Sequence, residues 1–396
     1  MIGGKIMRRI KIVTVFLLCL FCVTLFSSCE KPGTELSELM IMQGIGIDFE
    51  NDIYTVTVEI LNNEQSGSPG GDGTSENKTK IYSAKGETVS EALRKLTEKS
   101  GNEPLFAHNR VVVLGEKAIN RDLRDVIDFF ERDYDSRVSQ LICVAKNSSA
   151  EDLIRAELFK DGVKCEILEN MLEEGYNNSI IPRVRIIDAV NHLKDATSGL
   201  CIPAVSVQKN GENENYFLDG CGVFGADGKF LKYIDSATAE GLAFLNDTVK
   251  KGYITAHISD KGKATFLINK GKTSFEIIED DGVLKYNMKI KLSCDLDEIE
   301  GQENFKNDTE ILNALQKGVG ESICKKVENT FVSLQNTPSS DVIRFGKRLR
   351  LENLALYKTL ADDWGNIFPE IKLSVTVETT IRRIGEETFN SQKEIS

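Results

Sequence analysis

Histidine is scarce in this 396-residue chain, which has three, His108, His192 and His257, far apart in sequence. None stands in an HxH or HExxH arrangement, so a metal site or catalytic triad would have to assemble from distant segments. The chain also has no G-x-S-x-G elbow, no P-loop and no dinucleotide-binding fingerprint. We therefore predict a non-enzymatic protein with no catalytic residues, no metal site and no cofactor.

Basic residues are also in the minority, with 49 Lys and Arg against 61 Asp and Glu, a formal net charge of -12. Residues 1–28 hold four basic and no acidic residues, and without them the balance is 45 to 61, or -16. Such a surface repels phosphate backbones, and no Lys/Arg cluster interleaved with aromatics offsets it. Nucleic-acid binding is therefore not expected, while 41% apolar residues indicate a folded protein.

Paired cysteine motifs are missing beyond the first 28 residues. Cys19 and Cys22 lie within that segment and Cys29 directly follows it, whereas the other six are scattered: Cys143, Cys165, Cys201, Cys221, Cys294 and Cys324. Most of these six have apolar or strand-like neighbours, so we interpret them as buried structural thiols. Disulfides stay open in an extracytoplasmic protein, because spacing alone does not assign pairs.

A single long apolar run is present, Ile12 to Phe26, preceded by basic residues and followed by Ser27-Ser28-Cys29. At 15 residues the run is shorter than the roughly 20 needed to cross a bilayer, which favours a cleaved signal peptide over residues 1–28. Small residues directly before Cys29 resemble a lipobox, although Phe26 replaces the usual leucine. The resemblance implies lipid attachment at Cys29; an ordinary cleavage site or an uncleaved anchor helix is the alternative.

Residues 29–200 have the texture of an α/β domain. Residues 39–47 and 53–60 predict a β-hairpin, and the Gly- and Ser-rich stretch 62–80 predicts a mobile surface loop. Apolar periods predict helices around 89–96 and 123–130, buried strands at 110–114 and 141–145, and helices over 150–195 interrupted at Pro182. We place a domain boundary near Ile202-Pro203.

Residues 201–396 are richer in strands and form a second domain, as one lobe or as two, 201–250 and 251–396. The sequence predicts strands around 219–224, at 253–258, 264–268, 273–279, 285–294 and 371–377, and helices near 238–245, from Leu312 to Leu334 and around Leu356 to Trp364. The expected fold class is α+β, multi-domain, with antiparallel and mixed sheets and the long C-terminal helix packed on the second-half sheet.

Three features that could suggest chemistry have simpler structural interpretations. Glu131, Asp133 and Asp135 alternate with arginines and are typical of a helix end satisfied by ion pairs. Gly220 and Gly222 fit a bend within a strand. Trp364, the one tryptophan, stands at helical spacing from Leu360, which favours core packing over ligand stacking.

Several segments resemble, in order, the Ger(x)C family of spore germination lipoproteins, the C subunits of nutrient germinant receptors. In the first half they are Glu35 to Leu39, Gly44-Ile45-Gly46-Ile47-Asp48, the strand from Tyr54, Gly86 to Ala92, His108 to Gly115, Phe129 to Arg137 and Val144 to Lys146. In the second half they are Gly222-Val223-Phe224, Glu240-Gly241-Leu242 and Asp341 to Gly346, followed by Trp364 and Phe368. Glu30, Leu354 and Tyr357 depart from the family pattern and leave the subtype open.

The resemblance implies a lipoprotein on the outer face of the spore inner membrane that assembles with the integral membrane A and B subunits of a germinant receptor. Whether this chain contacts the nutrient stays open. A lipid-anchored solute-binding protein is the alternative, but it should show two similar α/β lobes, which the strand-rich second half disfavours. A surface hydrolase would need a nucleophile or metal constellation that three scattered histidines do not provide.

Overall fold

The computed structural model describes residues 14, 39–62, 78–132, 138–211, 213–258, 262–300, 308–337 and 341–384. The chain divides into two units, Met1–Leu39 and Met40–Ser396, and the sheets and helices below belong to the second. In the described part of the chain, no helix combines the length and the apolar character that crossing a membrane would require.

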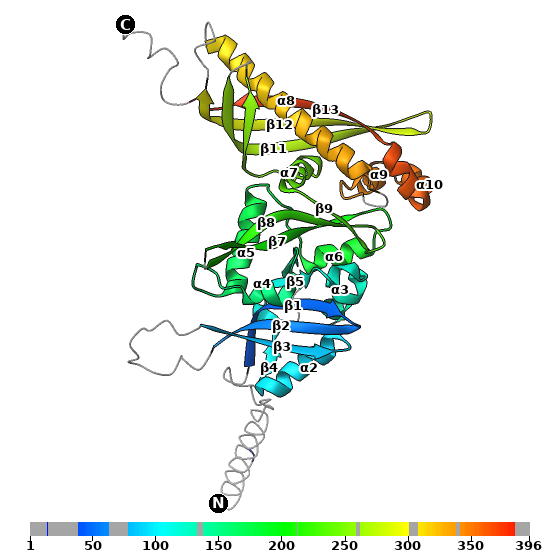
Figure 1. Cartoon of the computed structure of the whole chain (residues 1–396). Coiled ribbons are helices and arrows are strands. Elements are labelled where there is room, and N and C mark those ends of the chain that lie inside the picture. The colour runs from blue at the N-terminus through cyan, green and yellow to red at the C-terminus, as the bar shows by residue number, and fades with distance from the viewer. Residues whose placement is uncertain are drawn as a thin grey trace, which may run out of the picture. The chain divides into compact units, whose positions relative to one another are not determined.

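The first sheet contains nine described strands in the order β3-β2-β1-β5-β6-β7-β8-β9, with β4 paired to β1 (Figure 1). They are β1 (Leu39–Glu50), β2 (Ile53–Leu61), β3 (Thr79–Gly86), β4 (Glu103–Leu105), β5 (Val111–Gly115), β6 (Leu141–Ala145), β7 (Leu200–Asn210), β8 (Asn213–Phe224) and β9 (Phe230–Ile234). The central strands β1, β5, β6 and β7 run parallel, and the flanking pairs are antiparallel. The hairpin and the two buried strands expected from the sequence are confirmed.

Helices cover both faces of this sheet, as the apolar runs of β5 and β6 predict. They are α2 (Val89–Ser100), α3 (Leu123–Arg132), α4 (Ala150–Arg155), α5 (Lys164–Asn177), α6 (Ile186–Leu193) and α7 (Ser236–Leu245), with short 3-10 turns at Phe106–His108 and Ala118–Asn120. Val112 and Leu114 of β5 join the core with α2, α3 and α6, whereas Val111 and Val113 join the core with α4, α5 and α7. The period of two along one strand therefore separates the two layers.

The local start and stop signals of α2 work as the sequence indicates. The Thr88 hydroxyl accepts the Glu91 backbone N–H, and the Glu91 carboxylate accepts the Glu87 N–H in return. Gly101 ends the helix with φ of 73°, the left-handed conformation that costs glycine least. These caps satisfy backbone groups that the helix itself leaves unpaired.

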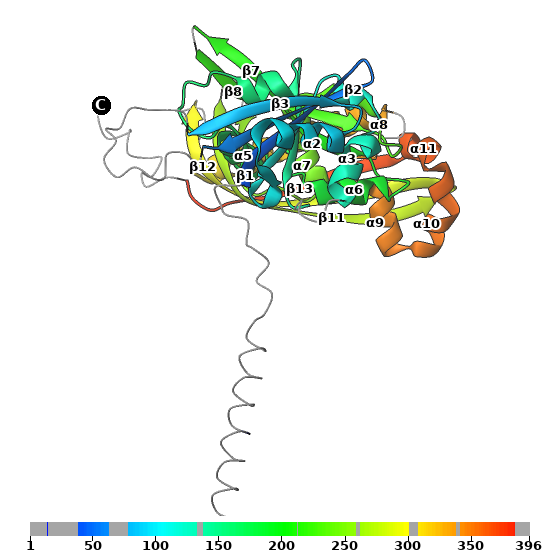
Figure 2. The same cartoon turned by 90° about the horizontal axis from the view of Figure 1, so that it is seen from below.

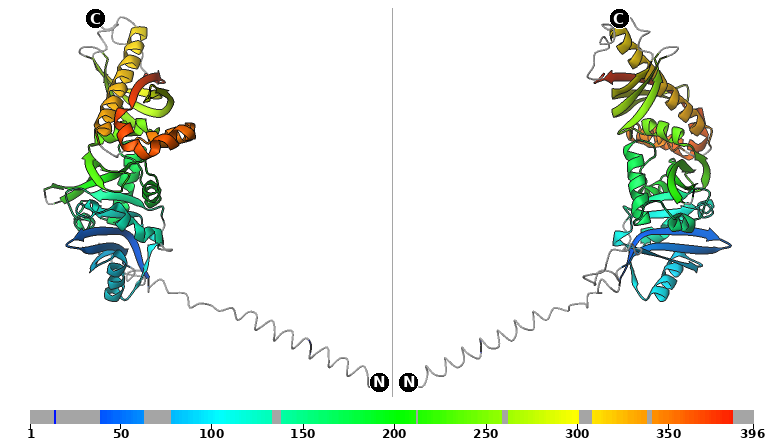
Figure 3. Two further views of the ribbon diagram at one scale, coloured as in Figure 1. Left: turned by 90° about the vertical axis from the view of Figure 1, so that its right-hand side faces the viewer. Right: turned by 60° about the vertical axis from the view of Figure 1, so that its left-hand side comes forward.

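The second sheet has the order β10-β11-β12-β13 and is covered by one long helix, α8 (Asp308–Gln335). Its strands are β10 (Gly252–His257), β11 (Lys263–Asp280), β12 (Val283–Glu300) and β13 (Lys372–Ile381). Both views of Figure 3 show α8, coloured yellow to orange, along one face of this sheet. The expected α+β class and the long helix packed on the second sheet are confirmed.

Two expected strands, 264–268 and 273–279, are in fact one strand, β11. Pairing with β12 is irregular between Ile268 and Lys270, and burial moves there from even-numbered to odd-numbered positions. Ala264, Phe266 and Ile268 face the core before the irregularity, and Thr273 does so after it. A β-bulge reverses the alternation of buried and exposed side chains without ending the strand. The period-two sequence pattern therefore breaks here although the strand continues.

A group of short helices lies between α8 and β13. It comprises α9 (Phe345–Glu352), α10 (Leu354–Leu360), α11 (Trp364–Ile367) and the 3-10 turns Ala361–Asp363 and Phe368–Glu370. Figure 2 shows α9 and α10 at one end of the second sheet. The helix expected around Leu356 to Trp364 corresponds to α10, the 3-10 turn after it and the start of α11, whereas α9 was not predicted.

The first sheet extends beyond the boundary expected after residue 200. β7 begins at Leu200, runs through Ile202 and Pro203, and pairs with both β6 and β8. The second sheet starts only at Gly252, close to the expected division between 250 and 251. In the stretch 62–80, Thr79 and Lys80 already belong to β3, and residues 63–77 lie outside the described part of the chain.

Candidate functional site

Cys29, the lipid-attachment site indicated by the sequence, lies outside the described residues. Lipid attachment there stays a prediction. The same holds for Asp133 and Asp135 of the acidic run. Glu131, which is described, forms an ion pair of 2.7 Å with Lys194 and so fits the structural interpretation of that run.

The Gly44-Ile45-Gly46-Ile47-Asp48 segment forms the end of β1 that meets the helices of one face. A Cβ atom at Gly44 would overlap the Cys165 thiol, so glycine allows α5 to pack against the strand. The Asp48 carboxylate accepts the backbone N–H groups of Ala150 and Glu151 at 2.8 and 3.0 Å. Burial raises the pKa of Asp48, opposed by those two bonds. This segment caps and seats helices and carries no exposed reactive group.

The Asp341 to Gly346 segment is organised in a similar way around a fully buried carboxylate. Asp341 accepts the backbone N–H groups of Phe345 and Gly346 at 3.0 and 2.7 Å and the Trp364 indole N–H at 3.1 Å. Its main-chain carbonyl accepts the Gly199 N–H, which comes from the loop before β7. Burial raises the pKa of Asp341 to about 6 in spite of these donors. Asp341 thus joins three separate segments of the chain.

Trp364 is buried, as the sequence indicates, and lies in the core with Phe345 and Phe368. A Cβ atom at Gly346 would overlap Thr197 and press on the Trp364 ring, so glycine is needed for this close approach. Phe345 stacks on Tyr286 of β12 with ring centroids 4.1 Å apart. The residues that resemble the family in the second half therefore form one packed unit.

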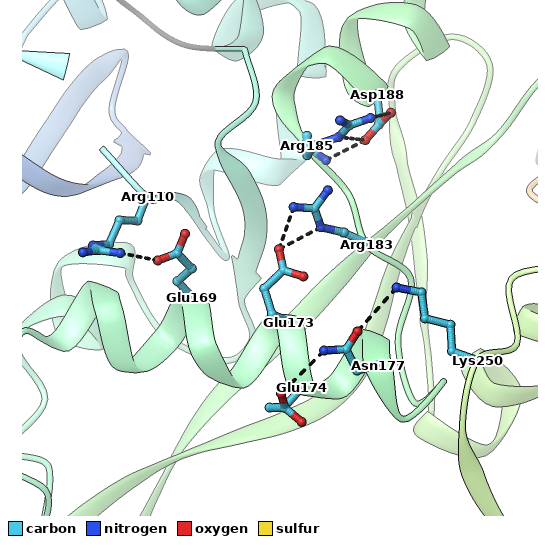
Figure 4. Close-up of polar contacts among 9 residues, drawn as sticks. All are labelled: Arg110, Glu169, Glu173, Glu174, Asn177, Arg183, Arg185, Asp188 and Lys250. Atoms are coloured by element: carbon cyan, nitrogen blue, oxygen red, sulfur yellow. Dashed lines mark hydrogen bonds and ion pairs between the residues drawn. The ribbon is translucent and has the colours of Figure 1, made fainter. Parts of the chain in front are cut away.

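A row of charged side chains lies on the solvent-facing side of α5 and the segment that follows it (Figure 4). Glu169 pairs with Arg110 at 2.6 Å and Glu173 pairs with Arg183 at 2.7 Å. Farther along, Asn177 bridges Glu174 and Lys250. These pairs are partly exposed, so each contributes little to stability, and their alternating charge is what a partner surface would meet.

Next to this row is a cavity of about 230 Å³ that is rich in arginine. Its polar lining includes Arg183, Arg185, Asp188 and Arg344, and its apolar floor comes from α7. Arg185 holds Asp188 through two guanidinium bonds of 3.0 and 3.1 Å. Burial alone would raise the pKa of Asp188, but the bonds from Arg185, with Arg344 nearby, keep it below its usual range.

Arg344 has a positive φ of 63°, which is uncommon for a residue with a side chain. Its side chain lines this cavity and also a smaller one beside His192. We take the row on α5 and the arginine-rich cavity together as the candidate functional site, a charged surface suited to binding. Sequence reasoning did not bring these residues together, because the arginines of the cavity come from segments more than 150 positions apart.

The three histidines remain apart in the structure. His108 and His257 are exposed, whereas His192 is buried and its Nε2 lies 3.0 Å from the Gly225 carbonyl oxygen. Burial lowers the pKa of His192 to about 4. Within the described residues, no three His, Cys, Asp or Glu side chains are placed to hold a metal ion.

The six later cysteines are all free thiols, which agrees with the structural interpretation. Five are buried and Cys324 is half-buried. Burial raises the pKa of the Cys143 and Cys165 thiols, which keeps them protonated and unreactive. These thiols fill the core.

Two protein-family models match the chain one after the other. Residues 33–207 match the family described as spore germination protein N-terminal domain, and residues 219–385 match the one described as spore germination B3/GerAC like, C-terminal. Together they account for most of the sequence that follows Cys29.

Curated relatives and a solved structure agree with these matches. The chain is 25% identical to spore germination protein KC of Bacillus subtilis (strain 168), over 93% of this chain and 96% of that protein. It is 25% identical to spore germination protein GerQC of Bacillus cereus, over 79% of this chain and 85% of that protein. The crystal structure of the GerBC protein superposes with a TM-score of 0.56 at 21% identity, covering 88% of this chain and 99% of that one, a likeness of fold.

Proposed function

This chain belongs to the Ger(x)C family of spore germination proteins, and from that premise we propose that it is the lipid-anchored, non-enzymatic C subunit of a nutrient germinant receptor. One observation carries the proposal. The two family matches run in order from residue 33 to residue 385, directly behind a leader that ends in small residues and Cys29. The folded part thus begins where a lipid anchor would end.

In this proposal the protein sits on the outer face of the spore inner membrane and assembles with the integral membrane A and B subunits. Tethering concentrates the folded part near those partners, so contacts of modest affinity suffice. The charged row on α5 and the arginine-rich cavity are the surfaces that we assign to partner contact. The described part offers binding surfaces and buried, protonated thiols, which fits a non-enzymatic role.

The solute-binding alternative is less well supported by the fold. Its two lobes should resemble one another, but here one sheet has helices on both faces and the other has α8 on one face. The division into an N-terminal part, 29–200, and a C-terminal part, 201–396, belongs to the same proposal. Since β7 crosses that division, the two parts would share the first sheet.

The proposal is tested with spores that carry Cys29→Ala, with Cys22→Ala as the matched control inside the leader. We expect Cys29→Ala to move the protein from the detergent phase to the aqueous phase, to lose co-purification of the integral receptor subunits and to reduce germination with nutrients. Germination with a non-nutrient trigger should persist, and Cys22→Ala should behave as wild type.

A normal nutrient response in Cys29→Ala spores, with no receptor subunit co-purifying from wild type, would overturn the proposal in favour of the solute-binding alternative. If Cys29→Ala abolishes detergent partitioning but does not change germination, Cys29 carries the lipid. The anchor is then not needed for receptor function.

A further inference from the structure

The turn between α9 and α10 exposes leucine to solvent. Leu351 is 78% exposed and Leu354 is 50% exposed, and no residue of α10 is buried. In Figure 2, α10 lies at the outer edge of the fold beside α9. We call the segment Arg344 to Leu360 the basic turn.

The basic turn is strongly cationic in an otherwise acidic chain. It contains five Lys and Arg and one acid, Glu352, whereas the whole chain has a net charge of -12. Four of the cations are exposed: Arg344, Lys347, Arg350 and Lys358. None of the four forms an ion pair with another described residue, although ion pairs are frequent elsewhere in the described chain.

The base of the basic turn is held firmly while its tip is free. Arg348 is directed inward, where it donates to the Leu245 carbonyl oxygen at 2.6 Å and lies over the Phe275 ring. Leu349 is buried, and Asp341 caps the start of α9. The exposed leucines and cations are therefore presented by a fixed support.

We propose that the basic turn docks on the surface of an anionic phospholipid bilayer. Lys347, Arg350 and Lys358 would meet lipid phosphates, and Leu351 and Leu354 would enter the interfacial layer, as in other amphipathic segments that lie on membranes. Charge complementarity and the two exposed leucines together select this occupant, because an anionic headgroup layer over an apolar interior offers partners to both the cations and the leucines.

The short segment between Cys29 and the fold explains why a second contact with the membrane would be useful. Ten residues separate Cys29 from Met40, and such a tether spans at most about 35 Å when extended. Lipid attachment at Cys29 is part of the proposed function, and this step rests on it. The lipid would hold the protein at the membrane without fixing which face of the protein lies against the bilayer. A second, weaker contact through the basic turn fixes that orientation.

The test uses the chain from residue 29 onward with Cys29→Ser, which carries no lipid and keeps every element from Met40. Its co-sedimentation is measured with vesicles of phosphatidylglycerol and phosphatidylcholine in equal parts and with phosphatidylcholine alone. We expect binding to the anionic vesicles, little binding to the neutral ones, and release in high salt. Two variants should bind the anionic vesicles at least about tenfold more weakly. They are the triple change Lys347→Glu, Arg350→Glu and Lys358→Glu, and the pair Leu351→Ser and Leu354→Ser.

Matched controls change equally exposed residues elsewhere. The charge control is Lys117→Glu, Lys209→Glu and Lys317→Glu, whose side chains are 66%, 80% and 76% exposed. The apolar control is Phe159→Ser with Val332→Ser. Both should bind within about twofold of the parent, and all variants should unfold at similar urea concentrations, since exposed sites contribute little to stability.

Equal binding to neutral and anionic vesicles, or equal losses in the controls, would overturn the proposal. So would variants of the basic turn that keep vesicle binding but lose the integral receptor subunits, because the partner would then be protein. Since the assay uses a chain without lipid, its failure is distinct from a failure of the Cys29→Ala experiment.

Discussion

Glu59 and Asp341 are buried carboxylates and Asp48 is a half-buried one, and such groups invite a search for catalysis. Each of the three accepts backbone N–H groups at the start of a helix. Glu59 accepts the N–H groups of Lys164 and Cys165 at 2.9 and 2.7 Å, where α5 begins. The first turn of a helix has unpaired N–H groups and a partial positive charge, which stabilise an anion. In this fold, an acidic side chain removed from solvent therefore indicates the start of a helix and not a catalytic site.

His192 gives a pH-dependent prediction at the same scale. Its pKa is about 4 in the folded protein and about 6.5 when unfolded, so the unfolded chain binds the extra proton first as the pH falls. The contribution of His192 to the free energy of unfolding is therefore fully present above pH 6.5. It falls by about 3 kcal/mol as the pH drops from 6.5 to 4. We expect His192→Gln to remove that loss, as measured by urea unfolding at pH 7 and pH 4.5.

The comparison with wild type isolates His192 from other titrating groups. Asp341, whose raised pKa acts in the opposite direction over an overlapping range, is present in both proteins. His108→Gln is the control, because His108 is exposed. If His192→Gln and wild type lose the same free energy of unfolding on acidification, His192 is not a buried group that stays neutral in the folded protein.

Local signals explain which elements could be predicted from the sequence. The helix α2 has both its caps and its apolar period within 14 residues, so nothing distant was needed. In contrast, β3 was missed because most of its positions are only half-buried and alternate weakly. The helix α9 was missed because its cap, Asp341, lies three residues before the N-cap position of Arg344. A strand with weak alternation and a helix whose N-cap residue makes no side-chain cap both leave little local pattern.

The face of α8 provides a prediction at the scale of the element. The sequence placed Leu312 on the buried face with Leu315, but Leu312 is half-buried and Ile311 is buried in its place. We expect Leu315→Ala to lower the free energy of unfolding by about 2–5 kcal/mol, because Leu315 is fully buried. Leu312→Ala, the same change three residues away, should cost less than about 1.5 kcal/mol.

Chemical denaturation of both variants at neutral pH provides the measurement, with the slope against denaturant checked for constancy. Equal losses for the two leucines would mean that α8 is rotated about its axis, so that Leu312 and Leu315 face the core alike. Equal losses would thus restore the face that the sequence indicated, whereas a loss at Leu312 alone would contradict both the sequence and the structure.

At the scale of the whole unit, the core runs without interruption from the first sheet to the second. One cluster of buried side chains includes Val113 of β5, Leu168 of α5, Phe266 of β11 and Leu315 of α8. The junction between the two halves of this cluster could not be assigned from the sequence, because composition and period do not say which apolar faces of the two halves meet. This continuity also explains why the boundary expected near Ile202-Pro203 falls inside the first sheet.

The hydrogen bond between Trp364 and Asp341 can be followed by fluorescence. Trp364 is the one tryptophan of the chain, and its indole N–H donates to the Asp341 carboxylate. Burial raises the pKa of Asp341 to about 6, so protonation should weaken that bond between pH 7 and pH 5. We expect the tryptophan emission of wild type to change with a midpoint near pH 6. Asp341→Asn should abolish that change and lower the free energy of unfolding at pH 7 by about 2–4 kcal/mol, because an amide cannot accept all three N–H groups.

Asp362→Asn is the matched control, since Asp362 is exposed and two residues from the same indole. It should keep both the midpoint and the stability of wild type. Wild-type emission that stays constant from pH 7 to pH 5 would show that Asp341 keeps one charge state in this range. An Asp341→Asn variant as stable as wild type would mean that packing of Trp364 and Phe368, and not the carboxylate, holds Trp364 against the start of α9.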